Sequence, residues 1–149
     1  AGNGIEIPDT ALRGISLVQL QQVLAFIRKR SSGPDGTLGG WLDCRFGQPL
    51  HFKSINLYDV NHHLLKRATE PRKCSYVEFV GTTPEDQDPE WFVSHWWGEA
   101  VAHFLLILQV FALKRGGRLV FWVCAYCNNQ HRLDEALAAD PRETSFFKA

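Results

Sequence analysis

The first strong pattern along the chain is the helical spacing of apolar residues in "SLVQLQQVLAFIRKR" (residues 16–30). Leu17, Leu20, Leu24 and Ile27 fall on one face of a helix there. The serine that begins the stretch and the glutamine three positions later form a capping-box pattern, and the three basic residues at its end suit the negative end of a helix dipole. The pattern predicts an amphipathic helix.

Three further patterns occupy the chain up to residue 69. "SINLYDVNHHLLKRAT" has Leu57, Val60, Leu64 and Leu65 on one helical face and predicts a second helix. "SSGPDGTLGG", between the two helices, contains four glycines and a proline and is expected to be a loop. The following "WLDCRFGQPLHF" favours a hairpin around Gly47.

The second half of the chain predicts a strand, a helix and a strand in succession. "WFVSH" (91–95) is expected to be a strand, and residues 100–115 have apolar positions at helical spacing before a basic turn and two glycines. "RLVFWVCAY" (118–126) is nearly all apolar, which is typical of a strand buried on both faces. Together they predict a βαβ unit with parallel strands. Upstream, "CSYVEFV" (74–80) alternates β-branched and aromatic residues and predicts another strand.

These elements predict one compact domain of the α/β class. A chain of 149 residues has the usual size of a single domain with one core. We divide it, for description, into a flexible arm (1–14), an α-rich N-terminal part (15–80), an acidic linker (81–90) and a βαβ core (91–149).

Composition and charge argue against several classes of protein. The chain is 45% hydrophobic and 21% charged, as globular proteins are. Its formal net charge is zero, with ten basic and seven acidic residues in 1–80 and six and nine in 81–149, so overall electrostatics do not favour a nucleic-acid partner. The longest apolar run, residues 100–113, is shorter than the roughly 20 residues that cross a bilayer, so we expect no membrane span.

The cysteines and the N-terminal sequence predict a cytoplasmic protein. The first 30 residues lack the basic start, apolar run and small-residue site of a signal peptide. Four cysteines in a domain of this size are then expected to be reduced thiols. The glycine-rich phosphate-binding patterns of dinucleotide-binding and P-loop proteins are missing from the sequence.

The residues best suited to bind a ligand or to carry out a reaction follow the two predicted parallel strands. "SHWWGE" comes after the first strand and "CAYCNNQH" after the second. Ligands bind beyond the carboxyl ends of the strands in open parallel sheets, so we expect both segments on one rim. The candidate ligand-binding residues of this rim are Ser94, Trp96, Trp97, Asn128 and Asn129.

His95 and Glu99 are the candidate catalytic residues, an imidazole that can carry a proton and a nearby carboxylate. Each also has a structural interpretation. Glu99 lies in the first turn of the predicted helix, where the dipole favours a carboxylate, and His95 can bond to a loop carbonyl. The two tryptophans can cover the end of the sheet instead of stacking on a ligand.

Cys124, Cys127 and His131 have the spacing C-x2-C-x3-H, and thiolate and imidazole groups are zinc ligands. A second C-x2-C is missing, and a cysteine at the end of a buried strand can act as a small apolar residue. A zinc-stabilised structural domain and a pair of plain thiols therefore both stay open, as does a nucleophilic Cys127 with His95 or His131 as base. The candidates for a fourth zinc ligand are His95, Cys74 and Cys44.

The segments "WFVSHWWGEAVAHFLLIL" and "VFWVCAYCNNQH" resemble a group of uncharacterised protist proteins, abundant in dinoflagellates, that carry "VSHWWG" and "WVCAY-x-NNQ" one βα unit apart. "NLYDV" and "CSYVEFV" resemble the same group, so the resemblance covers residues 14–149. More distantly, residues 92–95 are similar to the first strand of TIR-like domains. That similarity implies a flavodoxin-like parallel sheet, here an incomplete one beside an α-rich N-terminal part.

The TIR-like resemblance implies an interaction or signalling module. Some TIR domains cleave NAD with a glutamate on a later helix. This chain ends at "RETSFFKA", before the "W-C-x-x-E"-like segment that would carry such a glutamate, and so resembles a form truncated at its C-terminus. We expect a signalling module whose rim binds a nucleotide-like ligand.

Two alternatives to that expectation stay open, an NAD glycohydrolase-type enzyme fragment and a zinc-stabilised structural domain. NAD and zinc are accordingly the candidate cofactors, and neither is required. The expected partner is a protein or a second copy pairing at an exposed sheet edge, with no nucleic acid.

Overall fold

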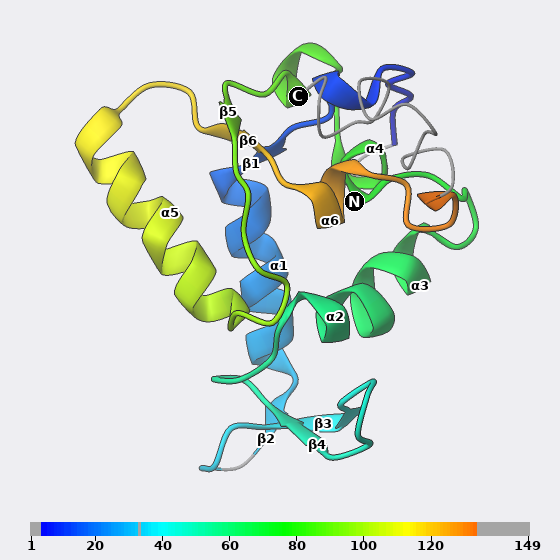
Figure 1. Cartoon of the computed structure of the whole chain (residues 1–149), viewed down its shortest axis with the longest axis vertical. Helices are drawn as coiled ribbons and strands as arrows, with labels where there is room; N and C mark the ends of the chain where they lie inside the picture. Colours follow the sequence, from blue (N-terminus) through cyan, green and yellow to red (C-terminus); the bar gives the residue numbers. More distant parts are fainter. Residues whose placement is uncertain (1–3, 33, 134–149) are drawn as a thin grey trace.

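The structure, a computed structural model, describes residues 4–32 and 34–133 (Figure 1). The described part is a mixed α/β fold with two small sheets and one parallel pair of strands. In chain order its elements are η1 (Thr10–Leu12), β1 (Ile15–Ser16), α1 (Leu17–Lys29), β2 (Ser31–Ser32), β3 (Thr37–Leu42), β4 (Pro49–His51), α2 (Leu57–Val60), the π-helical η2 (Asn61–Leu65), α3 (Lys66–Thr69), α4 (Tyr76–Val80), η3 (Glu85–Gln87), β5 (Trp91–Phe92), α5 (Val101–Arg115), β6 (Val120–Trp122) and α6 (Cys124–Cys127).

The first sheet has the strand order β1–β6–β5. Its central strand, β6, pairs antiparallel with β1, where Ile15 faces Phe121, and parallel with β5, where Trp91 faces the same Phe121. All three residues of β6 are buried, as the continuous apolar run predicts. The predicted unit of strand, helix and parallel strand is therefore confirmed as β5, α5 and β6.

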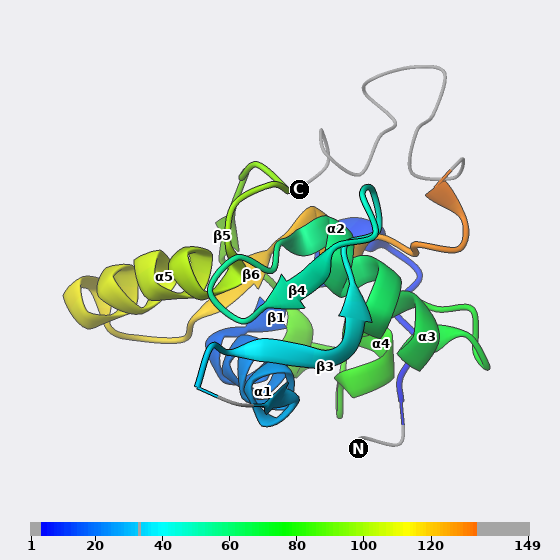
Figure 2. The same ribbon diagram turned by 90° about the horizontal axis from the view of Figure 1, so that it is seen from below.

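The predicted helices are confirmed as α1, the run α2–η2–α3, and α5. The expected capping box starts α1, because the Ser16 hydroxyl accepts from the Gln19 amide while the Gln19 side chain accepts from the Ser16 amide. α1 and α5 pack against each other (Figures 1 and 2). No helix in the described residues has the length and apolar character needed to cross a membrane.

The second sheet, β2–β3–β4, is antiparallel and contains the predicted hairpin around Gly47. Gly47 has a φ of +69°, a conformation that favours glycine. Residues 31–40, expected to be a loop, instead pair Ser31 with Leu38 as β2 and β3. The prediction of a loop is wrong because part of that glycine-rich stretch only turns the chain, at Gly36 with a φ of +75°, between two short strands.

The prediction of a strand over residues 74–80 is also wrong, since this segment contains the helix α4. A second capping box starts it. The Ser75 hydroxyl accepts from the Glu78 amide, and the Glu78 carboxylate accepts from both the Ser75 amide and the Ser75 hydroxyl. The alternation of β-branched and aromatic residues favours a strand, but these local hydrogen bonds favour the helix and prevail.

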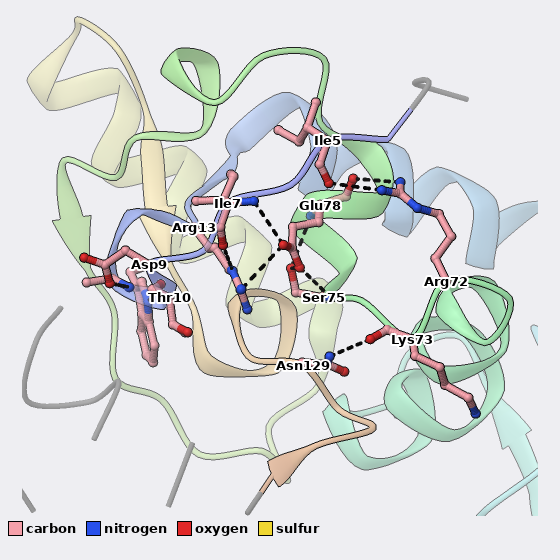
Figure 3. A network of polar contacts seen from close by, with 12 residues as sticks. Ile5, Ile7, Asp9, Thr10, Arg13, Arg72, Lys73, Ser75, Glu78 and Asn129 are labelled. Atoms are coloured by element: carbon pink, nitrogen blue, oxygen red, sulfur yellow. Dashed lines mark hydrogen bonds and ion pairs between the residues drawn. The ribbon is translucent and has the colours of Figure 1, made fainter. Parts of the chain in front are cut away.

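Glu78 also joins the N-terminal segment to α4 (Figure 3). Its carboxylate accepts from the Ile7 amide at 3.1 Å and lies 3.4 Å from the guanidinium of Arg13, which is itself largely buried. Its carbonyl accepts from the Ile5 amide at 2.8 Å. These bonds hold the described part of the segment that we expected to be a flexible arm against α4, and Ile7 lies in the core.

We expect Glu78→Gln to lower the free energy of unfolding by about 2–4 kcal/mol, because the buried Arg13 guanidinium then lacks its counter-charge. Urea denaturation measures this change. Glu70→Gln is the matched control. Glu70 is exposed and pairs with exposed Lys73 and with His131, so its substitution should leave the transition nearly unchanged. Equal stability of the two variants would show that the ion pair with Arg13 contributes little.

Candidate functional site

Residues 94–100, which connect β5 to α5, contain the motif "SHWWGE" and lie beside the start of α2. The Leu57 amide donates to the carbonyl of Trp97 at 3.0 Å, and Asn56 and Ala100 form an isolated antiparallel bridge. The loop is thus attached at its middle and at its end to the first residues of a helix that precedes it by about 40 positions in the sequence.

Trp97 connects the loop after β5 to the turn after β6. Its indole N–H donates to the sulfur of Cys124 at 3.0 Å, and its ring lies 5.4 Å from the ring of Tyr58. Cys124 is the first residue of α6, so the strand predicted over 118–126 is shorter than expected and ends at Trp122. Burial raises the pKa of the Cys124 thiol, which keeps it protonated at neutral pH.

Trp96, in contrast, points largely into solvent, with 72% of its area exposed. One side of its ring lies against Gly98, where a Cβ atom would come closer than van der Waals contact to three ring carbons. The tryptophan at 96 and the glycine at 98 are therefore linked physically, because only a residue without a side chain leaves room for the indole.

The two candidate catalytic residues are not joined to each other by a hydrogen bond. The His95 ring stacks on Phe104 with centroids 4.0 Å apart, and both of its nitrogens are buried without a partner. This burial lowers the pKa of His95, and nearby Glu99 only partly opposes the shift. The Glu99 carboxylate instead lies 2.7 Å from Nδ1 of His103, a contact that the i,i+4 spacing could have suggested.

The other candidate ligand-binding residues differ in their surroundings. Ser94 is exposed on the loop. Asn128 is buried, and its side-chain oxygen has no hydrogen-bond partner. Asn129 donates to the carbonyl of Lys73 at 2.6 Å and accepts from the His131 amide, so it joins the segment after α6 to the turn between α3 and α4. The side chain of Asn129 thus makes hydrogen bonds within the protein, to Lys73 and His131.

The residues of the candidate zinc site have separate partners. The sulfur of Cys127 accepts from the Val123 amide at 3.1 Å inside the core, and burial raises the pKa of this thiol well above its usual range. His131 lies 2.9 Å from the hydroxyl of Thr69. Within residues 4–32 and 34–133, no three His, Cys, Asp or Glu side chains come together as a metal site requires.

An aromatic cluster beside Trp97 is the feature that the sequence did not reveal. The guanidinium of Arg45 lies 5.3 Å from the ring of Tyr58 and 5.4 Å from that of Phe46. Tyr58 in turn contacts Trp97. Phe46 is 74% exposed in the turn between β3 and β4. We call the contacting residues Arg45, Phe46, Tyr58 and Trp97, together with the exposed Trp96 next to Trp97 in the sequence, the aromatic surface.

We expect His95→Phe to be at least as stable as the natural chain at pH 7, because the phenyl ring keeps the stack on Phe104 without two unpartnered nitrogens. The lowered pKa of His95 also determines whether stability rises or falls with pH. Below about pH 6.5 the unfolded chain binds a proton that the folded chain does not, so stability falls with pH toward the lowered value.

The variant should lose this part of the pH dependence. Thermal unfolding between about pH 5 and pH 7 measures it, with His62→Phe, at an exposed site, as control. An identical slope in His95→Phe and the natural chain would mean that His95 does not titrate differently in the two states.

We expect Gly98→Ala to displace the Trp96 indole with little loss of stability, since the ring is mostly exposed and can swing into solvent. The chemical shift of the Trp96 indole N–H in a ¹H–¹⁵N spectrum reports the change. Gly39→Ala is the control, because a Cβ there makes only ordinary contacts. If the indole N–H resonance of Trp96 is unchanged in Gly98→Ala, this prediction is wrong.

No protein-family model matches the chain, and neither a curated protein nor a solved structure matches it at a significant level. The function is therefore inferred from the residues of the loop and of the aromatic surface, and from their contacts.

Proposed function

We propose that this chain is a protein-interaction module that binds its partner through the aromatic surface. The observation that carries the proposal is the 72% exposure of Trp96, because tryptophan usually buries most of its large apolar area. Tryptophan, tyrosine and arginine are also the residues that contribute most to binding free energy in protein interfaces. All three occur on this surface.

The contacts within the aromatic surface support a binding role because they hold Arg45, Tyr58 and Trp97 in place before a partner arrives. Trp97 is fixed by its hydrogen bond to Cys124, and Tyr58 contacts both the Trp97 ring and the guanidinium of Arg45. Side chains that are already ordered lose little entropy on association, so more of the contact energy appears as affinity.

The surroundings of the candidate catalytic residues favour binding over chemistry. The nitrogens of His95 are buried against Phe104, and the Glu99 carboxylate is engaged by His103. Cys127, the alternative nucleophile, is buried, and its thiol stays protonated. A general base must reach the proton that it removes and a nucleophile must be ionised, and these positions supply neither condition.

A role in signalling is part of the proposal and rests on the TIR-like resemblance. The described residues contain one parallel pair of strands, β5 and β6, whereas that resemblance implies a larger parallel sheet. The proposal of an interaction module depends on the aromatic surface and does not require the larger sheet.

A nucleotide-like ligand is the second candidate, and the geometry of Trp96 favours it. One side of the indole lies against Gly98 and most of the remaining ring is open, so a base could stack on it. NAD is the natural probe. Saturable binding of NAD that requires Trp96 would make the loop a ligand site.

The test compares the natural chain with Trp96→Ala and Tyr58→Ala. A partner is first isolated from the source cells by affinity to the natural chain, and its binding in purified form is then measured by calorimetry. We expect each variant to weaken binding by about 30-fold, which is the effect of losing a residue worth about 2 kcal/mol.

Phe26→Ala, an exposed aromatic on α1 outside the aromatic surface, is the matched control and should change affinity less than about twofold. A partner that binds all four proteins equally would place the interface elsewhere. Titration of NAD to about 5 mM against the natural chain and Trp96→Ala is run alongside. Heat of NAD binding that disappears in Trp96→Ala would favour the nucleotide over the protein partner.

A further inference from the structure

α5 is apolar on both of its sides. Its inner side packs in the core through Val101, Phe104, Leu105 and Leu108. Its outer side exposes further large apolar residues, and Leu113 has 88% of its area in solvent. A helix that is apolar all round is normally buried all round. The exposed residues, which we call the outer stripe, are Leu106, Ile107, Val110 and Leu113.

The other long helix shows what an ordinary solvent-facing side looks like in this protein. α1 turns Gln21, Gln22 and Arg28 outward, and the two glutamines separate its two large exposed apolar side chains, Val18 and Phe26. On α5 no charged side chain interrupts the outer stripe before Lys114. Figures 1 and 2 both place α5 at one side of the molecule, with α1 on its inner side. Among the elements that the structure describes, none covers the outer stripe, so it can meet another molecule.

The charges at the two ends of α5 are opposite. At its start the Glu99 carboxylate contacts His103, and at its end Lys114 is exposed. If a second α5 lies antiparallel on the outer stripe, with Ile107 of one copy opposite Val110 of the other, Lys114 of each copy falls beside His103 and Glu99 of the other. Antiparallel helix dipoles add a smaller favourable contribution.

We infer that the outer stripe of α5 is the contact between two copies of this chain, related by a two-fold axis with their α5 helices antiparallel. Such an interface is self-complementary, since each contact occurs twice. A standard stable interface buries roughly 800 Å² on each partner, and four apolar side chains in each copy bury less than that. We therefore expect a weak dimer, with a dissociation constant in the micromolar range. This surface differs from the exposed sheet edge considered from the sequence.

Sedimentation of the whole chain between about 5 and 500 µM tests the inference. We expect a monomer–dimer equilibrium that Ile107→Asp and Leu113→Glu each weaken by at least about tenfold. Leu113 contacts little else, so its variant should fold even if Ile107→Asp does not. Leu12→Asp, at an exposed apolar position on η1, is the control and should leave the equilibrium unchanged.

Charge reversal tests the antiparallel orientation. Lys114→Glu should weaken the dimer several-fold, since the new carboxylate lies opposite His103 and beside the Glu99 carboxylate of the other copy, and His103→Lys in the same chain should restore the dimer. Trp96→Ala should leave the dimer intact, so the failure of this inference and that of the aromatic surface are separable. A chain that stays monomeric at about 500 µM, a dimer that resists Leu113→Glu, or a Lys114→Glu variant that associates normally overturns the inference.

Discussion

The burial of β6 on both faces is the constraint on which the rest of the structure depends. A strand without a polar face must be covered on both sides and must satisfy its backbone hydrogen bonds with strands on both edges. Those strands come from distant parts of the sequence, β1 at Ile15–Ser16 and β5 at Trp91–Phe92. Their side chains and neighbours also complete the cover, since Phe92 stacks on Trp122 and the Trp122 indole donates to the Thr10 carbonyl. The N-terminal segment and the βαβ unit therefore fold as one body around this strand.

The position of the aromatic surface follows from that strand. Because β5 and β6 are parallel neighbours, the segments that follow them leave the sheet at the same end, and Trp97 can reach Cys124. The same loop is closed on its other side by the backbone bond between Trp97 and Leu57. Trp97 is thus held by its ring and by its carbonyl, while its neighbour Trp96 is mostly exposed and lies over Gly98. One tryptophan fixes the loop and the other is presented by it.

Patterns that depend on local spacing could be predicted from the sequence, and those that depend on distant partners could not. The helices over 16–30 and 100–115 and the parallel βαβ unit follow from apolar period and capping residues alone. The segment 74–80 carries two contradictory local signals, and its strand-like alternation hid the serine-to-glutamate capping box that wins. Arg45 and Phe46 gave no signal, because their place beside Tyr58 is set by how the hairpin β3–β4 packs. His95 was a candidate catalytic residue from the sequence, whereas its stack on Phe104 depends on a partner that the sequence pattern did not identify.

The positions of the aromatic surface and of the outer stripe of α5 relative to each other matter if the chain binds a partner and also dimerises. The loop with Trp96 leads directly into α5, so in an antiparallel pair each aromatic surface lies at the opposite end of the contact between the copies. A helix of 15 residues is about 22 Å long, and the two loops are separated by a distance of that order. Two identical binding surfaces at a fixed separation give a second binding event a high effective concentration, provided that the partner presents two sites at a matching distance. A weak dimer is sufficient for this effect, because a bivalent partner itself stabilises the paired form. The outer stripe of α5 would then act as a selector for repeated or oligomeric partners over single ones.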